Sequence, residues 1–181
     1  MTIRAFFSEY LDHAILHGPS NRFFSDLRWK RLHPRLMQRS GRFSSLSGLS
    51  VPCPEGVWIG EGVSLNQYVI LNACNGGEIQ IGDYSLIGPF VLMRAADHEF
   101  SDPEKRISLQ GHRPGRIVLG EDCWIGGHTT ITRDVTIGRG CVIGAHSVVT
   151  RDVPPYSVAA GNPARVIRSR QERPAVKDEG A

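Results

Sequence analysis

Residues 119–154 read LGEDCW IGGHTT ITRDVT IGRGCV IGAHSV VTRDVP, six hexapeptides in one phase, and this stretch decides the fold. An aliphatic residue opens every hexapeptide, and glycine follows it in four of the six. The fifth position always holds a small or β-branched residue. A period of six is neither helical nor a simple alternation, and it predicts one short strand plus one turn per hexapeptide.

Three such units close a triangular coil of eighteen residues, and successive coils stack through parallel backbone hydrogen bonds. The aliphatic and small positions then face the interior, and glycine relieves crowding at the corners. Each coil buries its apolar faces only against its neighbours. Residues eighteen apart should stack, which pairs Cys123 with Cys141 and His128 with His146. We interpret the two cysteines as small core residues, because a reducing cytosol disfavours a disulfide.

The same phase recurs in residues 59–70 and 81–92, and it is broken by insertions at 72–79 and 94–118. The second insertion is polar, contains glycine and proline, and is long for a structureless connection, which favours a functional loop over residues 94–116. The predicted fold is therefore all-β, a parallel β-helix with an inserted loop.

The regions outside the repeat define three expected parts. Residues 1–50 have helix-compatible spacing, and we expect short helices that cap the open end of the prism. Residues 51–168 should form the β-helix domain, and residues 169–181 a polar tail.

Charge and composition narrow the class of protein. The formal net charge of +3 is too small to indicate nucleic-acid binding. Residues 21–42 hold seven basic residues against Asp26 alone, which fits either a solvated helix face or weak contact with a membrane surface. The N-terminus lacks the apolar core of a signal peptide, and no stretch approaches the roughly 18 apolar residues of a membrane span. We therefore expect a cytoplasmic protein.

The cysteines give no motif. The chain has four, with no close pair such as CxxC, so neither a zinc knuckle nor a disulfide scaffold is predicted. They stand at Cys53, Cys74, Cys123 and Cys141.

The run from Trp58 to Arg168 resembles the hexapeptide-repeat acetyltransferases, and in particular the maltose, galactoside, nodulation-factor and colanic-acid O-acetyltransferases. Three segments carry the resemblance: ADHEF with LQGHRPG (96–100 and 109–115), CWIGGHTTI (123–131) and VVTRDVPPYSVAAGNPARVIR (148–168).

This resemblance implies properties that periodicity does not give. They are a left-handed coil, a homotrimer, and acetyl-CoA bound in the groove between two adjacent prisms. The implied reaction is acetyl transfer to a hydroxyl of a sugar or polysaccharide precursor, without a metal.

His98 matches the catalytic position of the family, at the entry to the inserted loop. A sugar hydroxyl is a poor nucleophile at neutral pH, and a neutral imidazole can accept its proton during attack on the thioester. Asp97 and Glu99 are candidates to orient this imidazole, although adjacency in sequence does not establish contact. The alternative is an ordinary histidine on a surface loop.

Three further residues match positions near the acceptor and the acyl group. Asn66 matches an asparagine that holds the acceptor, and Trp124 matches a tryptophan that the family places beside the acyl and pantetheine region. The backbone N–H of Gly127 matches a donor to the thioester oxygen, an oxyanion role. Asn66 and Gly127 are also common turn residues, and that interpretation stays open.

The remaining matches concern the CoA end of the donor. Backbone groups of Ala145 would contact the pantetheine arm, and Thr150, Arg151, Arg165 and Arg168 match positions that contact CoA. Arginine is physically sensible against the phosphates of CoA. Each of these arginines alone could equally be a solvated charge.

Three other functions compete with this hypothesis. A β-helical carbonic anhydrase needs three histidines on zinc, two of them five residues apart, but Arg133 stands five after His128. A non-catalytic β-helix scaffold would need neither the histidine-bearing loop nor the arginines after GNPA. An N-acetyltransferase acting on an amino sugar fits the same motifs, and the sequence does not separate it from the O-acetyltransferase.

Overall fold

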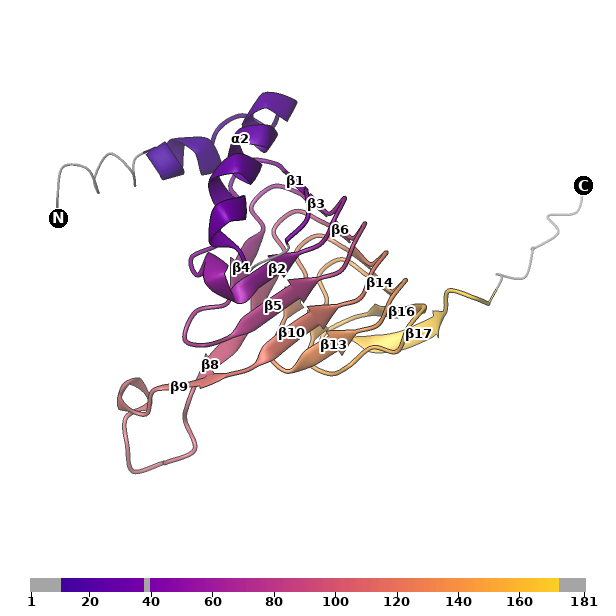
Figure 1. Ribbon diagram of the computed structural model, residues 1–181. Coiled ribbons are helices and arrows are strands. Elements are labelled where there is room, and N and C mark those ends of the chain that lie inside the picture. Colours follow the sequence, from indigo (N-terminus) through magenta and orange to yellow (C-terminus); the bar gives the residue numbers. More distant parts are fainter. Residues whose placement is uncertain (1–10, 38–39, 173–181) are drawn as a thin grey trace, which may run out of the picture.

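The computed structural model describes residues 11–37 and 40–172 and consists mostly of short strands arranged as a prism (Figure 1). The strands form three sheets, which we call A, B and C. Four times in succession the chain passes from a strand of sheet C to one of sheet A and then to one of sheet B. Each strand pairs in parallel with the equivalent strand one coil away. The three sheets therefore form the sides of the prism, and the all-β prediction is confirmed; the handedness of the coil stays a prediction.

The strands fall into three sheets and one hairpin. Sheet A contains β1 (Ser44–Ser45), β3 (Ser64–Leu65), β6 (Leu86–Ile87), β11 (Trp124–Ile125), β14 (Val142–Ile143), β16 (Ser157–Ala160) and the antiparallel β17 (Arg165–Ser169). Sheet B contains β4 (Ile70–Asn72), β7 (Leu92–Arg94), β12 (Thr130–Ile131) and β15 (Val148–Val149). Sheet C contains β2 (Val57–Ile59), β5 (Glu78–Ile81), β10 (Arg116–Leu119) and β13 (Val135–Ile137), and the hairpin contains β8 (Ala96–His98) and β9 (His112–Pro114).

The interior of the prism is filled as the repeat predicts. The aliphatic position of every hexapeptide is buried, and so is the small position. A fully buried aliphatic side chain contributes roughly 1.5–3 kcal/mol, so these columns supply the main stabilisation. The aliphatic column contains Leu119, Ile125, Ile131, Ile137, Ile143 and Val149, and the small column Cys123, Thr129, Val135, Cys141, Ser147 and Val153.

The eighteen-residue register is also confirmed. Trp124 pairs with Val142 across β11 and β14, and the rings of His128 and His146 stack with centroids 4.7 Å apart. Glycine after the aliphatic residue permits the close approach of the next coil. A Cβ on Gly126 would lie 2.5 Å from the backbone nitrogen of Ala145, a distance that real Cβ atoms do not adopt.

The two cysteine predictions have different outcomes. Cys123 and Cys141 are free and buried, as predicted, and burial raises the pKa of the Cys123 thiol to about 11. The expectation that the cysteines form no disulfide is wrong for Cys53 and Cys74, which are bonded with their Cα atoms 5.1 Å apart. Cys53 and Cys74 are 21 residues apart, since the insertion after β4 lengthens this coil. The eighteen-residue spacing therefore does not predict the pair.

Helices gather at the N-terminal end of the prism (Figure 1). Residues 11–16 are helical, α2 (Arg22–Leu32) packs against β1, and a 3-10 turn (His33–Arg35) follows it. Sheet A already begins at β1, ahead of the expected domain boundary at residue 51. Two further 3-10 turns are Pro54–Gly56 and Ile107–Leu109.

The basic stretch at residues 21–42 is largely engaged within the chain. Arg28 is fully buried, and its guanidinium donates to the carbonyl oxygens of Ser45, Ile15, Gly18 and Pro19. Burial lowers the pKa of Arg28 from its usual value. For this residue neither the solvated face nor the membrane contact considered from the sequence is correct.

Three other arginines of the basic stretch form ion pairs with aspartates. Arg31 and Arg35 both pair with Asp12, and Arg42 pairs with Asp26 at 2.8 Å. Asp12 lies outside the stretch in sequence, so counting acids within residues 21–42 underestimated the neutralisation. In the described part of the chain, no helix has the length and apolar character needed to cross a membrane.

We expect Arg28→Ala to lower the free energy of unfolding by about 2–4 kcal/mol, because charge-assisted hydrogen bonds contribute roughly 1.5–3 kcal/mol each and water replaces part of the loss. Urea unfolding measures the change. Lys30→Ala, an exposed position on the same helix, is the control and should shift stability by less than about 0.5 kcal/mol. Equal effects of the two variants would contradict a structural role for Arg28.

Candidate active site

The hairpin β8–β9 interrupts the regular coil between sheets B and C and carries His98 at the end of β8, where the loop begins. The N–H of Gly115 donates to the carbonyl of Ala95 at 2.8 Å, and the N–H of Glu78 donates to the carbonyl of Gly115 at 3.0 Å. These bonds tie both arms of the hairpin to the prism. The prism therefore holds the backbone of the hairpin in place. The side chain of His98 is exposed to solvent.

The two acids expected to orient His98 have other partners in this chain. Asp97 accepts a hydrogen bond from the guanidinium of Arg133 at 2.7 Å. Glu99 accepts backbone N–H groups of Ser101 and Phe100, at 3.0 and 2.9 Å, and these bonds lower the pKa of its carboxyl group. Neither acid holds the imidazole among the described residues.

The side chain that does contact His98 is His112, which sequence reasoning did not single out. The two residues are paired directly across β8 and β9, and their ring centroids are 4.4 Å apart. His112 belongs to the LQGHRPG segment, one of the segments that carry the family resemblance. The register across a long loop, however, does not follow from sequence spacing.

A second group of predicted residues shares the corner between sheets A and B, which we call the A–B corner. Asn66, Gly127 and Ala145 lie there on different coils. The side-chain oxygen of Asn66 accepts the N–H of Gln67 at 2.8 Å, a turn contact. Within the described residues, the backbone N–H groups of Gly127 and Ala145 have no hydrogen-bond acceptor.

Aromatic rings line the same corner in a column. Tyr68, Phe90, His128 and His146 stack in that order, with neighbouring centroids 4.7–5.0 Å apart. All four have φ between 56° and 58°, the left-handed region. Only the two histidines of this column follow from the eighteen-residue spacing, because an insertion separates Tyr68 from Phe90 and another separates Phe90 from His128.

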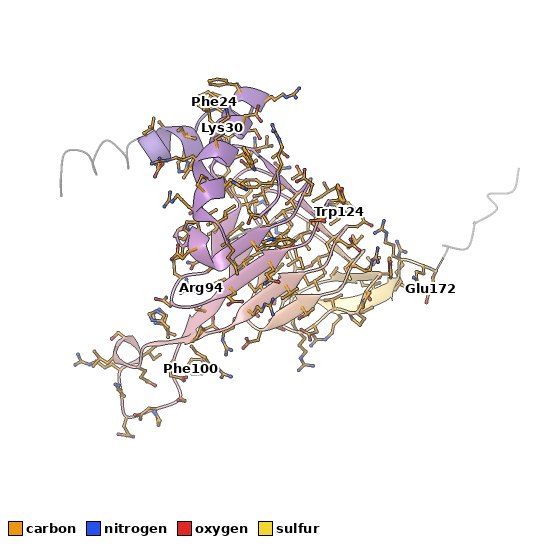
Figure 2. All side chains as sticks on the ribbon, in the orientation of Figure 1. Phe24, Lys30, Arg94, Phe100, Trp124 and Glu172 are labelled. Atoms are coloured by element: carbon orange, nitrogen blue, oxygen red, sulfur yellow. A yellow bond between two sulfur atoms is a disulfide. The ribbon has the colours of Figure 1, made fainter. Side chains whose placement is uncertain are left out.

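Trp124 lies on the outer face of sheet A, where 56% of its surface is exposed. It contributes to a cavity of about 270 Å³ with Leu86, Val142 and Arg170. Trp124 and Phe100, in the hairpin loop, lie on different sides of the prism (Figure 2). One chain therefore does not bring Trp124 to His98.

The four residues expected at the CoA end lie in two places. Thr150 and Arg151 follow β15 at the junction of sheets B and C, two coils after the hairpin, and both are exposed. Arg165 and Arg168 are exposed on β17. In the described chain their guanidinium groups bond only to backbone carbonyls, so their charge is not neutralised by a carboxylate.

The predicted residues thus form separate groups in a single chain. His98 projects from the junction of sheets B and C, whereas Gly127 lies at the A–B corner, at the other edge of sheet B. A flat sheet separates the expected base from the expected oxyanion donor. A single chain therefore does not bring His98 and Gly127 together.

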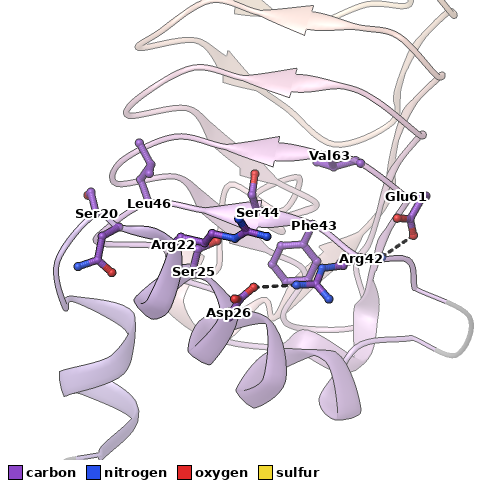
Figure 3. A pocket seen from close by; sticks show the side chains of 12 residues that line it. Ser20, Arg22, Ser25, Asp26, Arg42, Phe43, Ser44, Leu46, Glu61 and Val63 are labelled. Atoms are coloured by element: carbon purple, nitrogen blue, oxygen red, sulfur yellow. Dashed lines mark hydrogen bonds and ion pairs between the residues drawn. The ribbon is translucent and has the colours of Figure 1, made fainter.

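A cavity of about 500 Å³ lies apart from all of these residues, between α2 and the first coils (Figure 3). Arg22, Arg42 and Asp26 contribute to its wall, with Phe43 and Val63. Arg42 is paired with Asp26 across it. No residue predicted to take part in acyl transfer lines this cavity.

Metal-ligating side chains do not cluster in the chain as described. No group of three or more His, Cys, Asp or Glu residues there could hold an ion. His98 and His112 form a pair to which the described residues add no third ligand.

Comparison with known proteins gives the family. The bacterial transferase hexapeptide family (six repeats) matches residues 116–151. Nodulation protein L of Rhizobium leguminosarum is 43% identical over 144 residues, which cover 77% of this chain and 72% of that protein. The chain belongs to the hexapeptide-repeat transferase family.

Other relatives match over a shorter part of their length. Galactoside O-acetyltransferase of Escherichia coli is 42% identical over 52% of this chain and 46% of that protein. A Mycobacterium tuberculosis protein described as a probable acetyltransferase is 40% identical over 52% of this chain, but only 31% of that protein is covered. A hexapeptide-repeat acetyltransferase of Vibrio cholerae, solved in complex with acetyl-CoA, superposes with a TM-score of 0.75 at 28% identity, covering 94% of this chain and 90% of that one.

We expect Arg133→Leu to loosen the hairpin, because the bond from Arg133 to Asp97 is a contact between β8 and the next coil. A partly exposed pair contributes about 1 kcal/mol, so tryptic cleavage in the loop at Lys105 or Arg106 should accelerate about 5-fold. Arg139→Leu removes a more exposed ion pair, with Glu121 at another corner, and is the control. Identical cleavage rates in the two variants would show that Arg133 does not anchor the hairpin.

Proposed function

We propose that this protein transfers an acetyl group from acetyl-CoA to a hydroxyl of a sugar or polysaccharide precursor, with His98 as general base. The observation that carries the proposal is the exposed imidazole of His98 at the end of β8, on a hairpin that the prism and Arg133 hold in place. Membership of the hexapeptide-repeat transferase family supports it, as does the acetyl-CoA bound to the Vibrio cholerae neighbour.

The proposed reaction is a direct acyl transfer. The acceptor oxygen attacks the thioester carbonyl carbon while His98 takes the hydroxyl proton. The carbon–sulfur bond then breaks, CoA departs as a thiolate, and the imidazolium returns the proton to the sulfur. The backbone N–H of Gly127 stabilises the negative charge that develops on the carbonyl oxygen.

The site is proposed to lie between two copies in a homotrimer. One copy supplies His98, and the other supplies Gly127 from its A–B corner. Support comes from the separation of these two residues by sheet B within one chain. The same proposal includes a left-handed coil, as in the family that the sequence resembles, and a cytoplasmic location.

The donor is proposed to run along the groove between copies. Ala145 offers its N–H to the pantetheine arm, while Thr150, Arg151, Arg165 and Arg168 contact the CoA end. The charges of Arg165 and Arg168, which no carboxylate of the described chain neutralises, favour phosphate binding. Phosphate groups accept charge-assisted hydrogen bonds from guanidinium at little cost when the cation is already solvent-exposed.

The acceptor is proposed to lie near Asn66 and Trp124. A saccharide hydroxyl is favoured because the relatives include a galactoside O-acetyltransferase and nodulation protein L. Modification of a polysaccharide precursor is the corresponding biological role. The helices before residue 51 are proposed to cap the prism, since α2 packs on its first strand.

His98→Ala should reduce kcat by about 10²–10⁴-fold, the usual range for loss of a general base. The affinity for acetyl-CoA should stay within about 2-fold, because His98 acts only in proton transfer. Release of the CoA thiol with glycoside acceptors measures the rate, and amino sugars are tested in parallel. His17→Ala, at an exposed histidine away from the prism corners, is the control. Normal turnover by His98→Ala, or transfer to amines alone, would contradict the proposal.

Mixed trimers test whether the site is shared. Gly127→Pro removes the N–H, and proline is tolerated at the equivalent place one coil earlier, where Pro89 stands. Gly127→Ala keeps the N–H with the same added Cβ and should stay active. His98→Ala and Gly127→Pro should each retain only a small fraction of wild-type activity.

The two impaired variants should complement each other when co-expressed. Random mixing makes about three quarters of the trimers mixed, each with one intact site, so about a quarter of wild-type activity should return. No recovery on mixing would place the site within one chain.

A further inference from the structure

We propose that His112 is a positioning residue for the reaction, because its ring packs against His98 and fixes the orientation of the imidazole. This inference rests on the proposed function, in which His98 is the general base. The two rings have centroids 4.4 Å apart and planes inclined by 38°.

The contact between His98 and His112 is set by the backbone register of the hairpin. His98 and His112 are directly opposite in the antiparallel register of β8 and β9, and opposite residues in such a pair project from the same face. Asp97 projects from the other face, where it binds Arg133. Strand alternation therefore directs Asp97 away from His98 and directs His112 toward it.

The pair lies within the hydrogen-bonded ladder of the hairpin. The N–H of Glu99 donates to the carbonyl of Gly111 at 3.1 Å, one step beyond the two histidines. The loop of residues 100–110 then projects from the prism (Figure 1). Movement of the loop tip need not disturb the ring contact, since backbone bonds close the ladder on both sides of it.

An exposed histidine without such a contact would sample several side-chain rotamers, only some of which point the imidazole toward an acceptor. A neighbouring aromatic ring restricts that set. His112 touches neither the reacting atoms nor the donor in this mechanism, so its effect should appear in kcat and not in the KM for acetyl-CoA.

The test compares three variants by thiol release with a glycoside acceptor. His112→Ala should lower kcat about 3- to 10-fold, the span expected for one aromatic contact, with the KM for acetyl-CoA unchanged. His112→Phe keeps a planar ring and should recover to within about 2-fold of wild type.

The control for these variants is His17→Ala, which removes a nearly identical ring pair. The rings of His13 and His17 are 4.4 Å apart and inclined by 35°, but they lie in the N-terminal helical segment. This control should leave kcat unchanged. It shows that losing a histidine ring pair as such does not change turnover.

The double variant separates positioning from a general structural effect. If His112 acts through His98, adding His112→Ala to His98→Ala should cost no further activity. A full additional loss in that background, or wild-type kcat for His112→Ala alone, would overturn the inference. Full activity of His98→Ala would instead overturn the proposed function, so the two failures are distinguishable.

Discussion

Every coil of the prism must present the same cross-section to its neighbours, because its backbone N–H and C=O groups bond directly to the coils on either side. Stacked strands lie about 4.8 Å apart, and where glycine follows the aliphatic residue that spacing leaves no room for a Cβ. Gly126 shows the consequence, since a Cβ there would collide with the backbone of Ala145. The same spacing brings the rings of His128 and His146 into a parallel stack. The sequence meets this constraint by repeating the same residue types every six positions.

A uniform prism has flat sides, so chemistry must come from places where the repeat is broken or exposed. The hairpin that carries His98 leaves the coil at the junction of sheets B and C, and the other insertion, which contains Cys74, lies at the same junction one coil earlier. Pro114 of the hairpin lies over Gly76 of that earlier turn. The disulfide from Cys74 to Cys53 thus closes the coil directly beneath the hairpin, and the fold concentrates its irregular backbone along one edge.

The sequence was sufficient wherever a residue's environment repeats every eighteen positions. The buried columns, the pairing of Cys123 with Cys141 and the stack of His128 on His146 follow from that period alone. It was insufficient wherever contact depends on an insertion or on a different element. His112 faces His98 only because of the hairpin register, Cys53 reaches Cys74 only because of the inserted residues, and the charge of Arg31 is met by Asp12 from an earlier segment. Local pattern carries no information on such pairs.

The positions of the proposed catalytic groups explain why assembly and chemistry would be linked in this fold. His98 and Gly127 belong to opposite edges of sheet B, and no rotation of side chains within one prism can close that distance. Placing two prisms side by side brings an edge of one against an edge of the other without deforming either core. A base on a hairpin then meets a backbone N–H on a corner, and each is held by its own hydrogen-bonded stack. The rigidity that prevents a single prism from enclosing a cleft is what would fix the geometry between two of them.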